Sequence, residues 1–334
     1  MKSKKGVFIF FIVVALLFTV VYFNFDFNSN NEDSQNYQAY ITNAVDGTIS
    51  IIDLKAQELI ETIGIGEETS HGLAITPDGK ELFVGEEERG EVKVIDTANN
   101  FIIDNIATGK GIHGIDISPD GKYVFVASMA ADEVVIIDAE SKEIVKRLSE
   151  GIIDKPSGHV DFTPDNKFAL LTNLETDEVY VIDMSDFTVN TTIPVGEGPN
   201  ESRVSPDGKR AYVANWESNT ITVIDLEEFK TIEEIEAGEG THGVVVSPNG
   251  EEIWTANRRT NDVAVIDRED YQVKKYIDAG NYANHLMFTP DGKHVIVTNA
   301  RDNEAILIDA VNYEVVAEFE VGEDPHEIAI KALD

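Results

Sequence analysis

The chain of 334 residues contains no cysteine. Disulfide bonds, thiolate metal ligands, a cysteine nucleophile and lipid attachment through a cysteine are therefore excluded. Basic residues are also scarce, because 26 lysines and arginines stand against 62 aspartates and glutamates, for a net charge of −36. A surface of this charge repels phosphate backbones, so we expect no nucleic-acid partner. The acidity is typical of a solvated exterior in salty or alkaline surroundings.

Common catalytic motifs are missing as well. The sequence has no Gly-x-Ser-x-Gly elbow, no phosphate-binding loop and no metalloprotease helix motif. Carboxylate pairs are too numerous in this composition for one pair to be singled out. No residue can therefore be assigned a catalytic role from a motif.

One long apolar run occurs near the start, from Val7 to Phe23, and three lysines precede it. As a helix, this run would span about 26 Å, close to the hydrocarbon core of a thin bilayer. No Ala-x-Ala-like cleavage site follows it, so we expect residues 1–23 to form an uncleaved membrane anchor, with a cleaved signal sequence as the alternative. Residues 24–36 are predicted to be a polar linker. The remainder, residues 37–334, is expected on the extracytoplasmic side of the cell membrane.

The rest of the sequence is a repeat. A Ser/Thr-Pro-Asp/Asn-Gly/Asn turn recurs six times, and successive turn prolines are 42 or 45 residues apart. These prolines are Pro77, Pro119, Pro164, Pro206, Pro248 and Pro290. An aspartate that ends an apolar alternation occurs seven times, as Asp53, Asp96, Asp138, Asp183, Asp225, Asp267 and Asp309. Seven repeats are therefore present and one is split, and a period near forty is typical of propellers or solenoids.

Each repeat contains four short segments of alternating polarity. In one repeat these are residues 71–76, 81–85, 91–96 and 101–106. Four antiparallel strands make one blade of a propeller. The first repeat, residues 37–63, lacks the first strand, and residues 326–330 supply one at the other end of the chain. The predicted fold is thus an all-β, seven-bladed β-propeller closed by pairing of the N- and C-terminal strands, as one domain over residues 37–334.

The second strands of the repeats end in a recurrent motif. Five of them read Tyr40-Ile41-Thr42-Asn43, Leu170-Leu171-Thr172-Asn173, Tyr212-Val213-Ala214-Asn215, Trp254-Thr255-Ala256-Asn257 and Ile296-Val297-Thr298-Asn299. With the Ser-Pro-Asp-Gly turns, this sequence resembles the YVTN family of seven-bladed propellers, which is similar to cytochrome d1-type and nitrous-oxide-reductase-type propellers. The resemblance implies the fold and an exported or cell-surface location, but no single activity.

Six of the seven histidines stand at one place in the repeat, namely His71, His113, His159, His242, His285 and His326. His159 and His285 are shifted by one residue, which would turn a side chain to the other face of an ideal strand. The remaining blade has Asn200 and Glu201 there. Because first strands border the central channel of a propeller, we expect these side chains to form a ring at its mouth.

Two interpretations of the ring remain open. Neutral imidazoles suit copper or zinc, so the six histidines and Glu201 are candidates for binding a metal or another ligand. Nitrous-oxide reductase is understood to hold its copper cluster in such a ring, but this chain lacks a cysteine-containing copper domain, so that reaction is not expected. Alternatively, the histidines hydrogen-bond one another and neighbouring blades.

Loops expected on the same face contain Arg258, Arg259 and Arg301, which could hold a carboxylate or phosphate or balance nearby acids. The longest repeat places its extra residues on this face too, at 151–156. We therefore predict a monomeric, membrane-tethered binding scaffold for a transition metal, copper or zinc, or a small anionic ligand. The alternatives are a propeller enzyme, redox or lactone-hydrolysing, and a surface protein–protein interaction module without a metal site.

Overall fold

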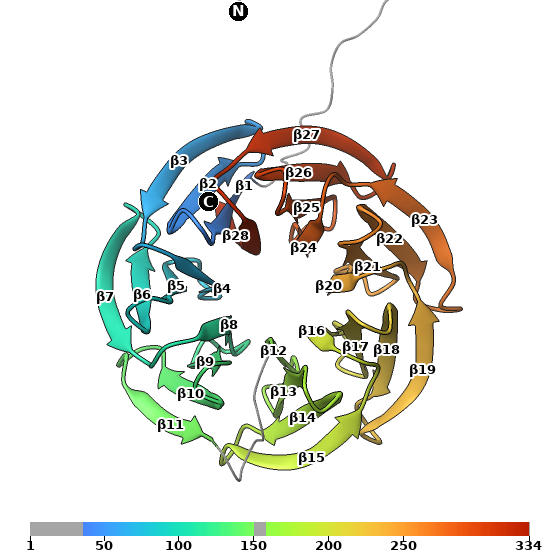
Figure 1. Ribbon diagram of the computed structural model, residues 1–334, viewed down its shortest axis with the longest axis horizontal. Coiled ribbons are helices and arrows are strands. Elements are labelled where there is room, and N and C mark those ends of the chain that lie inside the picture. Colours follow the sequence, from blue (N-terminus) through green and yellow to red (C-terminus); the bar gives the residue numbers. More distant parts are fainter. Residues whose placement is uncertain (1–35, 150–157, 334) are drawn as a thin grey trace, which may run out of the picture. The chain divides into compact units, whose positions relative to one another are not determined.

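The computed structural model describes residues 36–149 and 158–333. Within these ranges, seven four-stranded antiparallel sheets surround one axis as blades, which confirms the predicted seven-bladed propeller (Figure 1). None of these residues belongs to a helix capable of crossing a membrane. The predicted anchor, the linker up to residue 35 and the insertion at 151–156 lie outside the described residues. Asn36, assigned to the linker, already starts the first strand.

Each blade has four strands in order from the axis to the rim. The innermost strands are β28 (Pro325–Leu333), β4 (Thr69–Ile75), β8 (Ile112–Ile117), β12 (Val160–Phe162), β16 (Pro199–Val204), β20 (Thr241–Val246) and β24 (Ala283–Phe288). The second strands are β1 (Asn36–Asn43), β5 (Glu81–Glu86), β9 (Tyr123–Ser128), β13 (Phe168–Asn173), β17 (Arg210–Asn215), β21 (Glu252–Asn257) and β25 (His294–Asn299). The third strands are β2 (Thr48–Asp53), β6 (Glu91–Asp96), β10 (Glu133–Asp138), β14 (Glu178–Asp183), β18 (Thr220–Asp225), β22 (Asp262–Asp267) and β26 (Glu304–Asp309). The outer strands are β3 (Glu58–Gly64), β7 (Phe101–Ala107), β11 (Ile144–Leu148), β15 (Thr188–Pro194), β19 (Lys230–Glu236), β23 (Val273–Asp278) and β27 (Glu314–Glu320).

The two ends of the described chain close the ring. Strand β28 pairs antiparallel with β1, with Tyr40 opposite Ala329, and the sheet order is β28-β1-β2-β3. The Glu327 amide also donates a hydrogen bond to the Thr42 hydroxyl, 3.0 Å away. Closure removes the free sheet edges that an open array would expose. The predicted split blade is therefore confirmed.

The turns between first and second strands follow their sequence motif. In five of the six, a glycine has a positive φ, as in Gly79 at 69°. In the sixth turn, Asn166 takes this position at 58°, because asparagine tolerates the left-handed region better than most residues.

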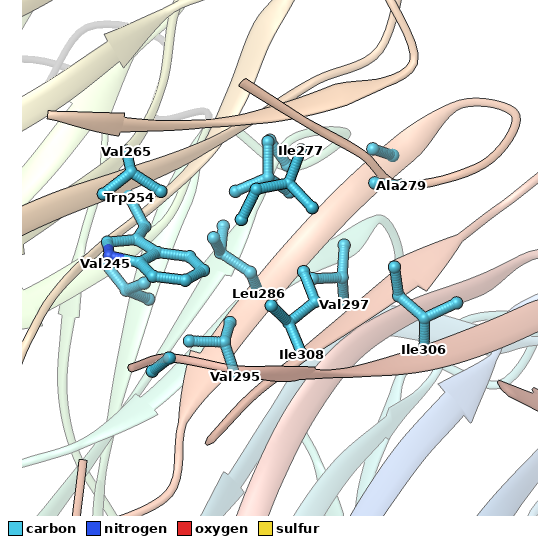
Figure 2. Packing of buried hydrophobic residues seen from close by; sticks show 14 of the residues in the cluster. Val245, Trp254, Val265, Ile277, Ala279, Leu286, Val295, Val297, Ile306 and Ile308 are labelled. Atoms are coloured by element: carbon cyan, nitrogen blue, oxygen red, sulfur yellow. The ribbon is translucent and has the colours of Figure 1, made fainter. Parts of the chain in front are cut away.

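The core lies mainly between blades. Trp254 of β21 is fully buried and packs with residues of the next blade, including Phe288, whose ring centroid is 5.4 Å away. Figure 2 shows Trp254 in this cluster with Val245, Leu286 and Val295. Phe83, Phe125 and Tyr212, on the second strands of other blades, are equally buried. These apolar layers fix how closely the innermost strands approach the axis.

Candidate functional site

Six imidazole rings, each from a different blade, meet in one cluster. The closest pair is His71 and His326, which are stacked with ring centroids 3.7 Å apart. His159 and His285 come from blades that are not neighbours in the ring, yet their centroids are 5.1 Å apart. The six histidines that the repeat aligns therefore come together in one cluster around the axis. The seventh, His294, begins β25 opposite Asp309 and has no contact with the cluster.

Bulges at the starts of the innermost strands explain why both histidine positions reach the cluster. In β24, Ala283 pairs with Asn299 and Leu286 with Val297, so two residues of β24 stand opposite one of β25. Such a bulge breaks the strict alternation of side chains along a strand. His285 can thus join the cluster although it is shifted by one residue.

Close packing of neighbouring innermost strands explains the glycine that follows three of the histidines. A Cβ on Gly114 would lie 2.5 Å from the carbonyl oxygen of Gly158, and one on Gly243 would lie 2.6 Å from that of Asn284. Both distances are far below a normal contact with backbone. A His-Gly pair therefore lets one blade supply an imidazole while the next strand passes directly beside it.

The histidine cluster has two layers. Four imidazoles, those of His71, His113, His242 and His326, line a cavity of about 280 Å³ together with Asn200, Trp216 and Arg258. The Asn200 amide nitrogen lies 2.9 Å from Nε2 of His242. Burial lowers the pKa of His113 to about 4 and that of His242 well below 6.5. These imidazoles are therefore neutral at pH 7.

The second layer contains His159, His285, Glu201 and Glu327, all buried. Nδ1 of His285 lies 3.3 Å from Oε2 of Glu201 and 3.6 Å from Oε2 of Glu327. Nδ1 of His159 lies 3.5 Å from the same Glu327 oxygen. The predicted site residue Glu201 therefore joins the histidines, and Glu327 adds a carboxylate that the sequence analysis had not singled out.

Arg203 lies beside this second layer and contacts several acids. Its guanidinium binds Glu201 and lies 3.9 Å from both Asp116 and Asp161. Burial, opposed in part by Arg203, raises the pKa of Asp116 to about 8. Although burial alone would raise the pKa of Glu201, Arg203 and His285 lower it. Glu201 is thus held as a carboxylate.

The three predicted anion-contact arginines form a second pocket, of about 340 Å³, with Trp216 and Tyr282. We call it the arginine pocket; Trp216 and Arg258 also line the histidine cavity, so the two adjoin. The guanidinium of Arg301 lies over the Tyr282 ring, 4.2 Å from its centroid, and that of Arg259 lies over Trp216 at 4.5 Å. Arg259 also pairs with Glu217 at 3.5 Å.

Arg258 connects the two pockets. Its guanidinium donates to Oδ1 of Asn284 and lies 3.3 Å from Nε2 of His326. Burial lowers its pKa to about 10, and Tyr282 and Asp324 offset this only in part. A partly buried guanidinium with only neutral hydrogen-bond partners attracts an anion.

Sequence reasoning missed Glu327, Arg203, Asp116 and Asp161. All four lie on innermost strands, on β28, β16, β8 and β12. Glu327 directly follows His326, and the others stand two or three residues after a candidate position, so the signal was present in the aligned repeats. It could be read only once the bulges were known, because they decide which residues face the axis.

Comparison with known proteins supports the fold. The lactonase family of seven-bladed β-propellers matches residues 40–314. A structure of a functionally unknown protein from Desulfotomaculum acetoxidans DSM 771 is similar with a TM-score of 0.77 and 16% identity, covering 89% of this chain and 99% of that one. A putative 6-phosphogluconolactonase from Bacteroides fragilis NCTC 9343 has a TM-score of 0.74 and 17% identity, and the match covers 90% of this chain and 99% of that one. A dihydro-haem d1 dehydrogenase has a TM-score of 0.66 and 18% identity, and the match covers 87% of this chain and 74% of that one.

No curated protein matches the sequence significantly. At these identities the solved structures show the fold alone, whereas the family match extends over most of the propeller. The split closing blade and the seven four-stranded sheets agree with that match. The chain therefore belongs to the lactonase family of seven-bladed β-propellers.

Proposed function

We propose that this chain is an exported, membrane-tethered propeller that binds a small anionic ligand in the arginine pocket. The export and the tether rest on the predicted anchor at residues 1–23. The binding rests on one observation: Arg258 and Arg301 carry positive charge in a pocket of a chain with net charge −36, and within the described residues neither makes an ion pair with a carboxylate at 4 Å or less. Asp324 compensates the burial of Arg258 only in part, so positive charge remains available to a ligand.

The shape and chemistry of the two adjoining pockets indicate the class of ligand. Guanidinium groups bind phosphate and carboxylate through paired hydrogen bonds. The neutral imidazoles and Asn200 of the histidine cavity can donate to and accept from hydroxyl groups. A phosphorylated sugar acid offers both kinds of group, and a putative 6-phosphogluconolactonase is among the structures with this fold.

Calorimetric titration of the full-length protein with 6-phosphogluconate tests the proposal. We expect binding that weakens as salt concentration rises, and an affinity loss of about tenfold or more in Arg301→Gln, since a hydrogen bond to a charged group contributes about 1.5–3 kcal/mol. The matched control is Arg210→Gln, because Arg210 pairs with Asp225 at 2.9 Å outside the pocket. Equal affinities in the three proteins, or no binding at all, would contradict the proposal.

Lactone hydrolysis is a second candidate, favoured by the family match and by the neutral His242 in the cavity beside Arg258. An unprotonated imidazole can take a proton from an attacking water, and general-base catalysis contributes about 10²–10⁴-fold. We expect acid release from 6-phosphogluconolactone above the rate in buffer, and a loss of that excess in His242→Gln. Release at the buffer rate with wild-type protein would reject this activity and leave the binding proposal standing.

A further inference from the structure

We propose that His159, His285 and Glu327 form a binding site for a divalent transition-metal ion, with zinc the first candidate. The site lies in the second layer of the histidine cluster and does not depend on the arginine pocket. One ligand atom from each residue lies within 4.8 Å of the others, and all three side chains are buried. The ion would be held by coordination bonds alone, with no covalent change to the protein.

Two of the three distances between ligand atoms suit a small metal ion, and the third, between the two histidines, is no more than 4.8 Å. Nδ1 of His159 and Nδ1 of His285 lie 3.5 and 3.6 Å from Oε2 of Glu327. Tetrahedral zinc, with metal–ligand bonds of about 2.0–2.2 Å, separates its ligands by about 3.3–3.6 Å. Two nitrogens and one carboxylate oxygen are a ligand set that zinc sites use, with a fourth position left for water or substrate.

Four polar side-chain atoms of these three residues make no hydrogen bond of normal geometry to any described residue, although Nδ1 of His285 lies 3.3 Å from Oε2 of Glu201. Within the described residues, both ring nitrogens of His285, Nε2 of His159 and Oε2 of Glu327 are buried without a hydrogen bond. Buried polar atoms in native proteins are nearly always satisfied, so a group of them at one point calls for a ligand. A metal ion would satisfy Oε2 of Glu327 and one nitrogen of each histidine at once.

The charge around the site favours a cation. Four carboxyl groups lie around one guanidinium, that of Arg203: they belong to Asp116, Asp161, Glu201 and Glu327. Of these, Glu201 and Glu327 are buried and the two aspartates are partly buried. Arg203 supplies one positive charge among these four acids, so a dication beside them would interact favourably with those that are ionised, such as Glu201.

The histidine cavity gives the ion a route to the site. Its lining residues His242 and His326 contact the second layer directly, with ring centroids 4.8 and 4.6 Å from that of His285. The imidazoles that line the histidine cavity would thus pass an ion to the second layer, where Glu327 completes the ligand set. Glu201, whose Oε2 lies 3.3 Å from Nδ1 of His285, would add negative charge beside the ion.

Metal titration of full-length protein purified without a histidine tag and stripped with a chelator tests the proposal. We expect one zinc ion per chain by calorimetry and elemental analysis, and a tetrahedral visible spectrum when cobalt(II) replaces zinc. Glu327→Gln and His285→Gln should bind about a hundredfold more weakly or not at all. His294→Gln, outside the cluster, and Arg301→Gln, in the arginine pocket, should bind as the wild type does.

Three outcomes would overturn the proposal. The first is that wild-type protein takes up no stoichiometric zinc or cobalt, and the second is that Glu327→Gln binds with unchanged affinity because exposed carboxylates hold the ion. The third is that His71→Gln loses metal binding while Glu327→Gln retains it, which would place the ion among the imidazoles that line the histidine cavity. If the buried variants fail to fold, the cobalt spectrum of the wild type and the His71→Gln result still decide the question. Failure of anion binding leaves this test unaffected.

Discussion

Single polar side chains hold the turns of each blade. Oδ1 of Asp53 accepts hydrogen bonds from the amides of Lys55 and Ala56, at 2.9 and 2.8 Å, and the other strand-end aspartates make equivalent bonds. Three asparagines that end second strands donate to the start of the third strand: Asn43 to Thr48, Asn215 to Thr220 and Asn257 to Asp262, at 2.8–3.1 Å. These residue types recur at the ends of strands because they satisfy polar groups in turns.

At the residue scale we predict a pH-dependent contribution from Glu252. Its carboxylate accepts hydrogen bonds from Lys274 at 2.7 Å, Trp254 at 2.9 Å and Tyr313. Burial would raise its pKa, but these donors outweigh burial and lower it. A lowered pKa in the folded state stabilises the protein above the unfolded-state pKa of about 4.3, and this contribution disappears as the pH falls through the folded-state value.

Glu252→Gln should therefore lower the free energy of unfolding by about 1–2 kcal/mol at pH 7 and by much less at pH 3. Urea denaturation at both pH values measures the difference. Glu269→Gln serves as the control, because this glutamate is exposed. A deficit of the same size at both pH values would show that the charge of Glu252 is irrelevant.

At the scale of elements, the innermost strands differ most from regular β-structure. Their bulges allow consecutive residues to face the axis, and their glycines allow neighbouring strands to touch. The outer strands, by contrast, are largely exposed along their length, as in β3 and β7. The strands that carry the candidate site are therefore also the ones with the least freedom to change.

We predict that Gly114→Ala destabilises the propeller by about 1–3 kcal/mol, because the added methyl group would overlap the backbone of the next blade. Gly64→Ala is a matched control in β3, where an added Cβ meets nothing within 4 Å. Thermal and urea unfolding of the two variants provide the comparison. If both variants unfold like the wild type, the tight contact at Gly114 does not exist in solution.

At the scale of the whole molecule, stability depends on closure of the ring. Strand β28 covers the inner edge of β1 and supplies His326 and Glu327 to the histidine cluster. The closing blade thus joins the most distant parts of the described chain and contributes to both layers of the candidate site. Closure and site assembly should be lost together.

Deletion of residues 323–334 should leave β1 as an unpaired edge, which promotes aggregation and proteolysis. We expect cleavage by a nonspecific protease at least about tenfold faster than in the full chain, together with larger species in size-exclusion chromatography. Deletion of residues 332–334 alone is the control, since the pairs from Gln38 with Lys331 to Asn43 with Pro325 remain. Equal resistance of the two truncated proteins would mean that closure contributes little.

Local signals in the sequence determined the propeller itself. These signals are the repeat period, the alternating strands and the Pro-Asp-Gly turns. They depend on contacts between residues close in the chain, and they recur from one repeat to the next. Even the split blade followed from counting, because one repeat lacked a first strand and the C-terminal residues supplied it. The alignment of six histidines was visible for the same reason.

Only the tertiary structure decided how those histidines are used. Whether His159 and His285 face the axis depends on bulges, and whether they meet Glu327 depends on how closely the blades pack around that axis. The position of Arg258 between the two pockets also depends on the packing of blades, because its partners Asn284 and His326 belong to other repeats. Each repeat specifies its own blade through local pairing. A site on the axis draws residues from several blades, so the distances within it are set by the curvature of the complete ring.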